Sequence, residues 1–230
     1  MIRTFKALSA LLSYPSTDLQ EAIPAIRDVL KSEAIVSARA LNAIEPLLVE
    51  FETGDIFDLQ ERYVLLFDRS RTLSLNLFEH IHGEGRDRGG AMVDLLETYR
   101  AGGFDLVSTE LPDHLPVLLE FISTLSLGEA RALLADAGHI IAALAERLTR
   151  RETPYASVLV ALSETAQASI ETEEAQALIA EKDDDPEDLE ALDAVYEEAM
   201  VTFGPDPNAG CPVSRDILAR MDEPLRPASA

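Results

Sequence analysis

Apolar residues recur at intervals of three and four positions along most of the chain, which is the spacing of one face of an α-helix. No segment shows the sustained alternation of apolar and polar residues that is typical of a strand. The pattern therefore predicts an all-α protein, folded as a single-domain helical bundle. Two of the clearest stripes are Leu115, Leu118, Leu119, Ile122 and Leu125, and then Leu133, Leu134, Ala137, Ile141, Leu144 and Leu148.

Several residues mark where the predicted helices begin, end or bend. Ser126 and Glu129 have the spacing of a capping box, and Gly102-Gly103 ends the helix that precedes it. Pro24 and Pro46 fall within helical patterns, where each removes one backbone donor. We therefore expect a break or a kink at both prolines.

The last quarter of the chain differs from the rest in composition. Residues 171–230 contain 17 acidic and 4 basic residues, which is −13 of the whole chain's −23. Residues 183–186, Asp-Asp-Asp-Pro, are typical of a linker, and a short helical pattern follows them. Beyond Gly204, prolines, glycine and small residues predict a poorly ordered tail. We expect a helical domain over residues 1–182 and an acidic extension with one short helix over residues 183–230.

Charge and composition narrow the classes of partner and compartment. With 42 acidic and 19 basic residues, the chain repels a phosphate backbone, so we expect no nucleic-acid partner. The same negative field attracts basic peptides.

The single cysteine, Cys211, excludes an internal disulfide and favours a reducing compartment, for which the cytoplasm is the default. The longest apolar run, residues 140–145, is far below the roughly 18 residues that cross a bilayer, so we expect no membrane span.

Residues 67–90 depart from the bundle pattern, because histidines, carboxylates, arginines and glycines crowd around a few apolar residues. Loops that carry binding residues often have this composition. A long solvated connection with local Asp–Arg pairs would look the same, so composition alone leaves both interpretations open.

The same stretch holds side chains that could bind a metal ion or act as general acids and bases. Their spacing matches no standard helical zinc pattern, because adjacent and alternate histidines project in different directions on a helix. A metal site and acid–base chemistry are therefore minor alternatives. The residues concerned are Glu79, His80 and His82, with Asp87 or His114 as a further ligand.

Two longer motifs carry a family resemblance. The first runs from Tyr63 to Arg69 and from Ser74 to Leu95, and the second is Glu110-Leu111-Pro112-Asp113-His114-Leu115-Pro116, leading into Leu119-Glu120-Phe121. The first is similar to the central signature of the NarJ family, the assembly chaperones of membrane-bound respiratory nitrate reductase. The second resembles the Glu-Asp-His motif of the wider TorD-like redox-enzyme chaperones, and the opening Leu11-Leu12-Ser13-Tyr14-Pro15 also fits. The resemblance covers residues 1–170, although Gly85 and Gly90 depart from the family pattern and loosen the loop.

The resemblance implies an all-α, cytoplasmic chaperone that catalyses no reaction and binds no cofactor stably. Such a protein binds the N-terminal, leader-like segment of the nitrate reductase catalytic subunit and keeps it competent for molybdenum cofactor insertion and membrane attachment. Proteins of molybdenum cofactor biosynthesis are a second class of candidate partner. Two other functions remain open: a chaperone of the same fold for another molybdoenzyme, and a metal-dependent hydrolase built on Glu79, His80, His82 and His114.

A client leader is amphipathic and basic, so a groove with apolar anchors and an acidic rim would suit it. We expect the apolar anchors to be Leu66, Phe67, Leu77 and Phe78. The expected partners of the client's positive charges are Asp68, Glu79, Glu84 and Asp113. The remaining candidate site residues are His80, His82, Arg86, Asp87, Arg88, Glu110 and His114.

Overall fold

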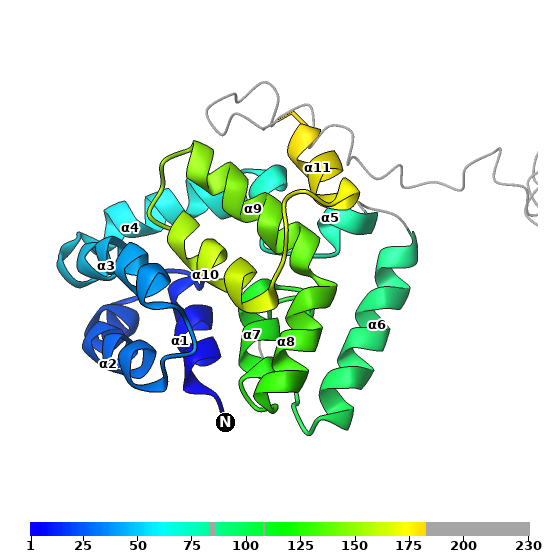
Figure 1. Ribbon diagram of the computed structural model, residues 1–230, viewed down its shortest axis with the longest axis horizontal. Coiled ribbons are helices and arrows are strands. Elements are labelled where there is room, and N and C mark those ends of the chain that lie inside the picture. Colours follow the sequence, from blue (N-terminus) through cyan, green and yellow to red (C-terminus); the bar gives the residue numbers. More distant parts are fainter. Residues whose placement is uncertain (83–85, 108, 183–230) are drawn as a thin grey trace, which may run out of the picture. The chain divides into compact units, whose positions relative to one another are not determined.

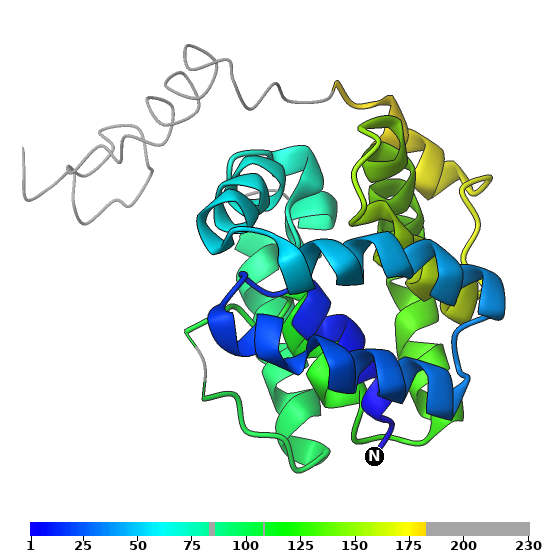
Figure 2. The same ribbon diagram turned by 90° about the vertical axis from the view of Figure 1, so that its left-hand side faces the viewer.

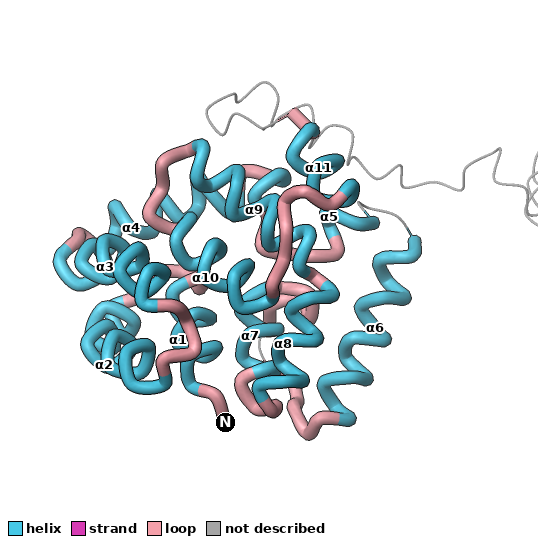
Figure 3. Tube along the Cα trace, in the orientation of Figure 1, coloured by secondary structure: helices cyan, strands magenta, loops and turns pink. Residues whose placement is uncertain are grey.

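The computed structural model describes residues 1–82, 86–107 and 109–182. Every element in these ranges is helical (Figure 3), and the predicted all-α fold is confirmed. The α-helices are α1 (Arg3–Leu11), α2 (Thr17–Glu33), α3 (Ala38–Thr53), α4 (Ile56–Tyr63), α5 (Glu79–His82), α6 (Arg86–Ala101), α7 (Leu115–Ile122), α8 (Leu127–Asp136), α9 (Gly138–Arg150), α10 (Ala156–Ala166) and α11 (Glu173–Ala180). Between α4 and α5 lie a π-helical turn, η1 (Val64–Asp68), and a 3₁₀ turn, η2 (Arg71–Leu73).

The acidic extension predicted over residues 183–230 lies outside the described residues, together with its short helix, its tail and Cys211. Within the described ranges, no helix combines the length and the apolar character that crossing a bilayer requires.

The core is built by amphipathic helices that turn their apolar stripes toward one another. α9 and α10 pack together in the middle of the fold (Figure 1), and α10 also contacts α3 and α8. α2 and α3 lie side by side (Figures 1 and 2), and α1 packs between α2 and α7. In α7 every residue except Glu120 is buried, which explains why its sequence is apolar all round.

The two prolines do not break their helices, so this part of the prediction is wrong. α2 continues through Pro24, and α3 continues through Pro46. Both prolines lie on the exposed side of the helix, where solvent can satisfy the carbonyl that loses its donor. The opposite side of each helix is buried in the core, and that packing maintains the helix across the missing hydrogen bond.

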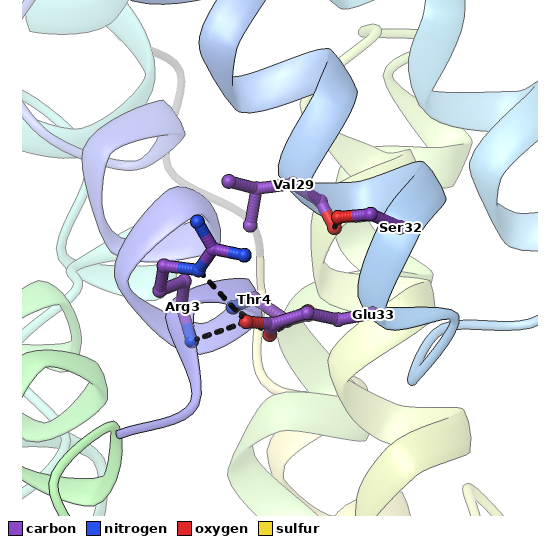
Figure 4. Close-up of polar contacts among 5 residues, drawn as sticks. All are labelled: Arg3, Thr4, Val29, Ser32 and Glu33. Carbon is purple, nitrogen blue, oxygen red and sulfur yellow. Dashed lines mark hydrogen bonds and ion pairs between the residues drawn. The ribbon is translucent and has the colours of Figure 1, made fainter.

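Helix ends are satisfied by the side chains that the sequence places there. The predicted capping box of α8 is confirmed, with Ser126 and Glu129 bonding each other's backbone N–H groups. The start of α1 is capped from a distant helix (Figure 4): one Glu33 oxygen accepts from Thr4 N at 2.8 Å, and the other accepts from Arg3 N at 3.2 Å. Glu33 is the last residue of α2, so this carboxylate joins the two helices.

The stretch 67–90 is only partly the solvated loop that composition allowed. Residues 72–75 and Leu77 are buried, because the chain passes through the core between η2 and α5. Residues 86–90 form the first turns of α6, which runs along one edge of the bundle (Figure 1). Among the α6 side chains that the structure describes, only Tyr99 is buried. Residues 83–85 lie outside the described ranges.

Candidate functional site: an acidic cleft beside the joined motifs

The two motifs that stand out in the sequence lie against each other in the structure. Asn76 and His114 form an isolated antiparallel bridge. Leu115 N donates to the Leu75 carbonyl at 2.8 Å, and Leu77 N donates to the Asp113 carbonyl at 3.0 Å. The segment before α5 is therefore fixed to the segment that enters α7.

The buried side chain of Asp113 stabilises this junction. Its side chain is fully buried, and one carboxylate oxygen accepts from Phe78 N at 2.9 Å while lying 4.0 Å from the Arg88 guanidinium. Burial raises the pKa of Asp113, against the opposing effects of the Phe78 hydrogen bond and the Arg88 charge. A carboxylate in this position holds the two motifs together and is not exposed to a client.

Glu79 and His80 also make internal contacts. Ser74 donates its hydroxyl to Glu79 at 2.7 Å, and the His80 ring donates from Nε2 to the Ser74 carbonyl at 2.8 Å. Burial lowers the pKa of His80, which keeps the ring neutral and suited to this single donation. His82 packs edge-on against Phe78, with 5.9 Å between ring centroids.

His114 and Glu110 sit at the edge of the junction. The Nδ1 atom of His114 lies 3.8 Å from a Glu110 oxygen. Burial lowers the pKa of His114, although the charges of Glu110 and Asp113 act in the opposite direction. Glu110 keeps 58% of its side chain exposed, so its charge faces solvent beside the ring.

A cleft of about 720 Å³ opens next to this junction. Its apolar lining includes Phe67 on η1, residues of the segment 104–107 and Val117 on α7. Four carboxylates line it, and the described lining residues include neither lysine nor arginine. The cleft therefore combines apolar walls with four acidic side chains, which are Asp68, Asp105, Glu110 and Glu120.

Only part of the predicted groove lines this cleft. Phe67, Asp68, Glu110 and His114 do. Leu66 and Leu77 are instead buried in the core, and Phe78 packs against it while half-buried. Asp87 is exposed on the first turn of α6, Arg88 turns toward Asp113, and Glu84 and the side chain of Arg86 lie outside the described residues.

Sequence reasoning missed most of the other residues that line the cleft. Tyr14 lies in the opening motif, so a signal for it was present. Glu120 likewise lies in the second motif, at Leu119-Glu120-Phe121. Asp105 had no such signal, because its segment meets the other walls of the cleft only in the folded chain. Glu120 reaches the cleft from the one exposed side of α7, and Asp105 from the segment after α6.

The residues considered as metal ligands do not converge. Among the residues that the structure describes, no group of three or more histidine, cysteine, aspartate or glutamate side chains could hold a metal ion. The His80 ring is hydrogen-bonded to the Ser74 carbonyl. His114 lies on a different segment from His80 and faces Glu110, four residues before it. The residues of the site that the structure describes thus form no assembled metal centre.

Comparisons with known proteins agree with the two motifs. Residues 15–161 match the family model described as Nitrate reductase delta subunit. The chain is 42% identical over 212 residues to the nitrate reductase molybdenum cofactor assembly chaperone NarJ of Escherichia coli strain K12, which covers 88% of this chain and 86% of that protein.

Two further relatives extend the comparison. The chain is 36% identical over 214 residues to the protein named probable nitrate reductase molybdenum cofactor assembly chaperone NarW of the same strain, covering 91% of this chain and 87% of the relative. It is 33% identical over 159 residues to the corresponding protein named NarJ of Bacillus subtilis strain 168, covering 68% and 84%. The chain therefore belongs to the NarJ family of nitrate reductase molybdenum cofactor assembly chaperones.

Proposed function

We propose that this protein is a cytoplasmic, non-catalytic chaperone that binds the N-terminal segment of the respiratory nitrate reductase catalytic subunit. By holding that segment, it keeps the subunit competent for molybdenum cofactor insertion and for later membrane attachment. The observation that carries the proposal is the acidic cleft beside the joined motifs. Family membership indicates which enzyme is the client, since relatives are named as nitrate reductase assembly chaperones.

The size of the cleft suits part of an amphipathic helix. Its volume of about 720 Å³ is within the range of roughly 300–1,000 Å³ that is typical of ligand sites. Phe67, Leu106 and Val117 offer apolar contacts of the kind that receive one face of a helix. Burial of apolar side chains here would supply most of the affinity.

The charge of the cleft favours a basic client. Asp68 and Asp105 are exposed, and Glu120 keeps 46% of its side chain accessible while lying 4.0 Å from Lys6. Such exposed carboxylates contribute modestly to affinity, because water and salt screen them. Their main effect is to raise the encounter rate and to orient the client's positive residues toward the cleft.

The molybdenum cofactor belongs to the client enzyme, and the chaperone acts on the polypeptide that receives it. Proteins of molybdenum cofactor biosynthesis would then meet the chaperone–client complex as a second class of partner.

Calorimetric titration with a peptide of the first residues of a nitrate reductase catalytic subunit tests the charge contribution. We expect Asp68→Asn to weaken binding by about three- to tenfold at low salt and to reduce the dependence of affinity on salt concentration. Glu21→Gln is the matched control, because it removes the same charge from an exposed position on α2 outside the cleft. Equal losses in both variants would show that net charge acts without a defined acidic site.

A further inference from the structure

A second, smaller hollow adjoins the cleft. Its volume is about 210 Å³, and it is lined by Tyr14, Gln60, Glu61, Val64, Leu65 and Arg69. Tyr14 and Val64 line both hollows, so these two residues lie at the boundary between them. Gln60 closes part of its wall by donating from Nε2 to the Pro15 carbonyl at 2.9 Å.

The π-helical turn η1 forms the wall that the two hollows share. Val64, Phe67 and Asp68 face the main cleft, whereas Leu65 and Arg69 face the second hollow. The Arg69 N–H donates to the Val64 carbonyl at 3.0 Å, and this bond to the residue five positions earlier defines a π-helical turn. Such turns are rare and are frequently found at functional sites. Here the wider turn presents neighbouring side chains to two different hollows.

The two hollows differ in charge. The main cleft has four carboxylates and no arginine or lysine among its described lining residues. The second hollow has one carboxylate, Glu61, and one guanidinium, Arg69, so its formal charge is balanced. Basic side chains of a client are therefore drawn to the main cleft, and the second hollow exerts no comparable selection for charge.

We propose that the second hollow is an anchor subsite, which receives one large apolar side chain at one end of the client segment held in the main cleft. This inference rests on the proposed function. At about 210 Å³ the hollow is smaller than the roughly 300 Å³ at which independent ligand pockets begin, yet it can accommodate one side chain. Because Tyr14 and Val64 line both hollows, the two adjoin, and the same polypeptide segment is the natural occupant of both.

The surfaces that would hold such an anchor are accessible. Tyr14 is 52% exposed and rests edge-on against Tyr63, with ring centroids 5.6 Å apart, so its free face is available to an incoming side chain. Leu65 is half-buried and does not belong to the hydrophobic core. Arg69 is exposed at the rim, where its guanidinium can cover an aromatic anchor.

Mutating Leu65 tests the proposed anchor subsite directly, because Leu65 lines the second hollow and not the main cleft. The probe is the peptide of the first residues of a nitrate reductase catalytic subunit, together with variants in which each large apolar residue is replaced in turn by alanine. For one of these residues, the replacement is expected to weaken binding to the wild-type protein about tenfold. The same replacement is expected to have no effect on binding to Leu65→Ser, because the hollow no longer recognises the anchor.

Val49→Ser is the control, since it changes an exposed apolar residue on α3 that lines neither hollow. It should leave the tenfold discrimination intact. If every peptide binds wild type and Leu65→Ser with the same relative affinities, the anchor subsite is wrong while the proposed function stands. If the unmodified peptide binds neither protein, the proposed function fails and the anchor inference falls with it.

An optical measurement locates the anchor independently of affinity. The chain contains no tryptophan, so Tyr14→Trp introduces a single tryptophan at the boundary between the hollows. Binding of the parent peptide should shift or quench its emission, and the peptide that lacks the anchor residue should produce a smaller change at saturation. Identical changes with both peptides would contradict an anchor next to Tyr14.

Discussion

At the scale of single residues, Glu33 shows how one carboxylate joins two helices that are distant in sequence. Burial disfavours its ionised form, but hydrogen bonds from Thr4 and Arg3 outweigh that effect and lower the pKa of Glu33. Because the folded pKa lies below the unfolded value of about 4.3, the carboxylate stabilises the protein above that pH. This contribution is lost as the pH falls through the folded pKa.

Replacing Glu33 with glutamine should therefore destabilise the protein in a pH-dependent way. We expect a loss of about 1 kcal/mol in the free energy of unfolding near neutral pH, as for other helix caps. Urea denaturation from about pH 7 to about pH 3 should show the difference from wild type shrinking toward the acid end. A difference that stays constant over this range would contradict a role for the ionised carboxylate.

The space around Gly102 is too small for a larger side chain. A Cβ atom at this position would lie 2.6 Å from Cε2 of Phe121, whose ring packs against Tyr99 and Phe104. Gly102→Ala should consequently lower the free energy of unfolding by about 1–3 kcal/mol, which thermal or urea denaturation measures. At Gly90, within α6, a Cβ atom meets nothing within 4 Å, so Gly90→Ala should be neutral or stabilise by up to about 1 kcal/mol. Similar losses in the two variants would contradict a specific clash at Gly102.

The motif residues illustrate what a sequence can and cannot indicate. Asp113 and His114 stood out in the sequence, and the structure places both at the junction of the two motifs. Their side chains nevertheless have different surroundings: Asp113 is fully buried, whereas His114 lines the cleft. Only the folded chain separates a residue that holds the two motifs together from one that lines the cleft.

At the scale of elements, the buried Arg147 of α9 joins three parts of the chain. Its guanidinium donates to the Thr72 carbonyl of η2 at 2.6 Å and to the Leu178 carbonyl of α11, and it lies 3.6 Å from Glu181. Thr72 precedes the cleft-lining residues 74–76 by two positions. The position of that wall therefore depends on Arg147, although Arg147 does not line the cleft.

We predict that Arg147→Met destabilises the protein by at least about 2 kcal/mol, because two buried carbonyls lose this donor. Hydrogen exchange in residues 70–76 should also accelerate relative to the rest of the core. Arg150→Met provides the control on the same helix, since Arg150 is 53% exposed and pairs only with Glu146 among the described ion pairs. That variant should change stability by less than about 0.5 kcal/mol, and equal losses would refute a special role for Arg147.

Helices could be predicted well because their signal is local. The stripe from Leu115 to Ile122 and the capping box at Ser126 both appear in the structure as expected. Of the break or kink expected at Pro24 and Pro46, a break does not occur, because packing of the opposite helix face compensates for one missing hydrogen bond. The π-turn could not be predicted either, since no periodic pattern distinguishes it from the end of α4.

At the scale of the whole molecule, the cleft arises from segments far apart in sequence. Ser9 and Tyr14 come from the first fifteen residues, Phe67 from η1, and Glu120 from α7. Periodicity assigns each of these to a helix or its end, but it does not say which ends meet. The net charge of −23 indicates an acidic chain, whereas the meeting of Asp68, Asp105, Glu110 and Glu120 at one cleft depends on the fold.

Hydrogen exchange of the full-length protein, with and without a saturating nitrate reductase N-terminal peptide, tests most directly whether this cleft is the client site. The account predicts slower exchange upon binding in residues 63–68, 104–107 and 114–117, which surround the cleft, and little change in α2 and α11. Protection confined to α2 or α11 by a peptide that demonstrably binds, with the three cleft segments unchanged, would contradict it.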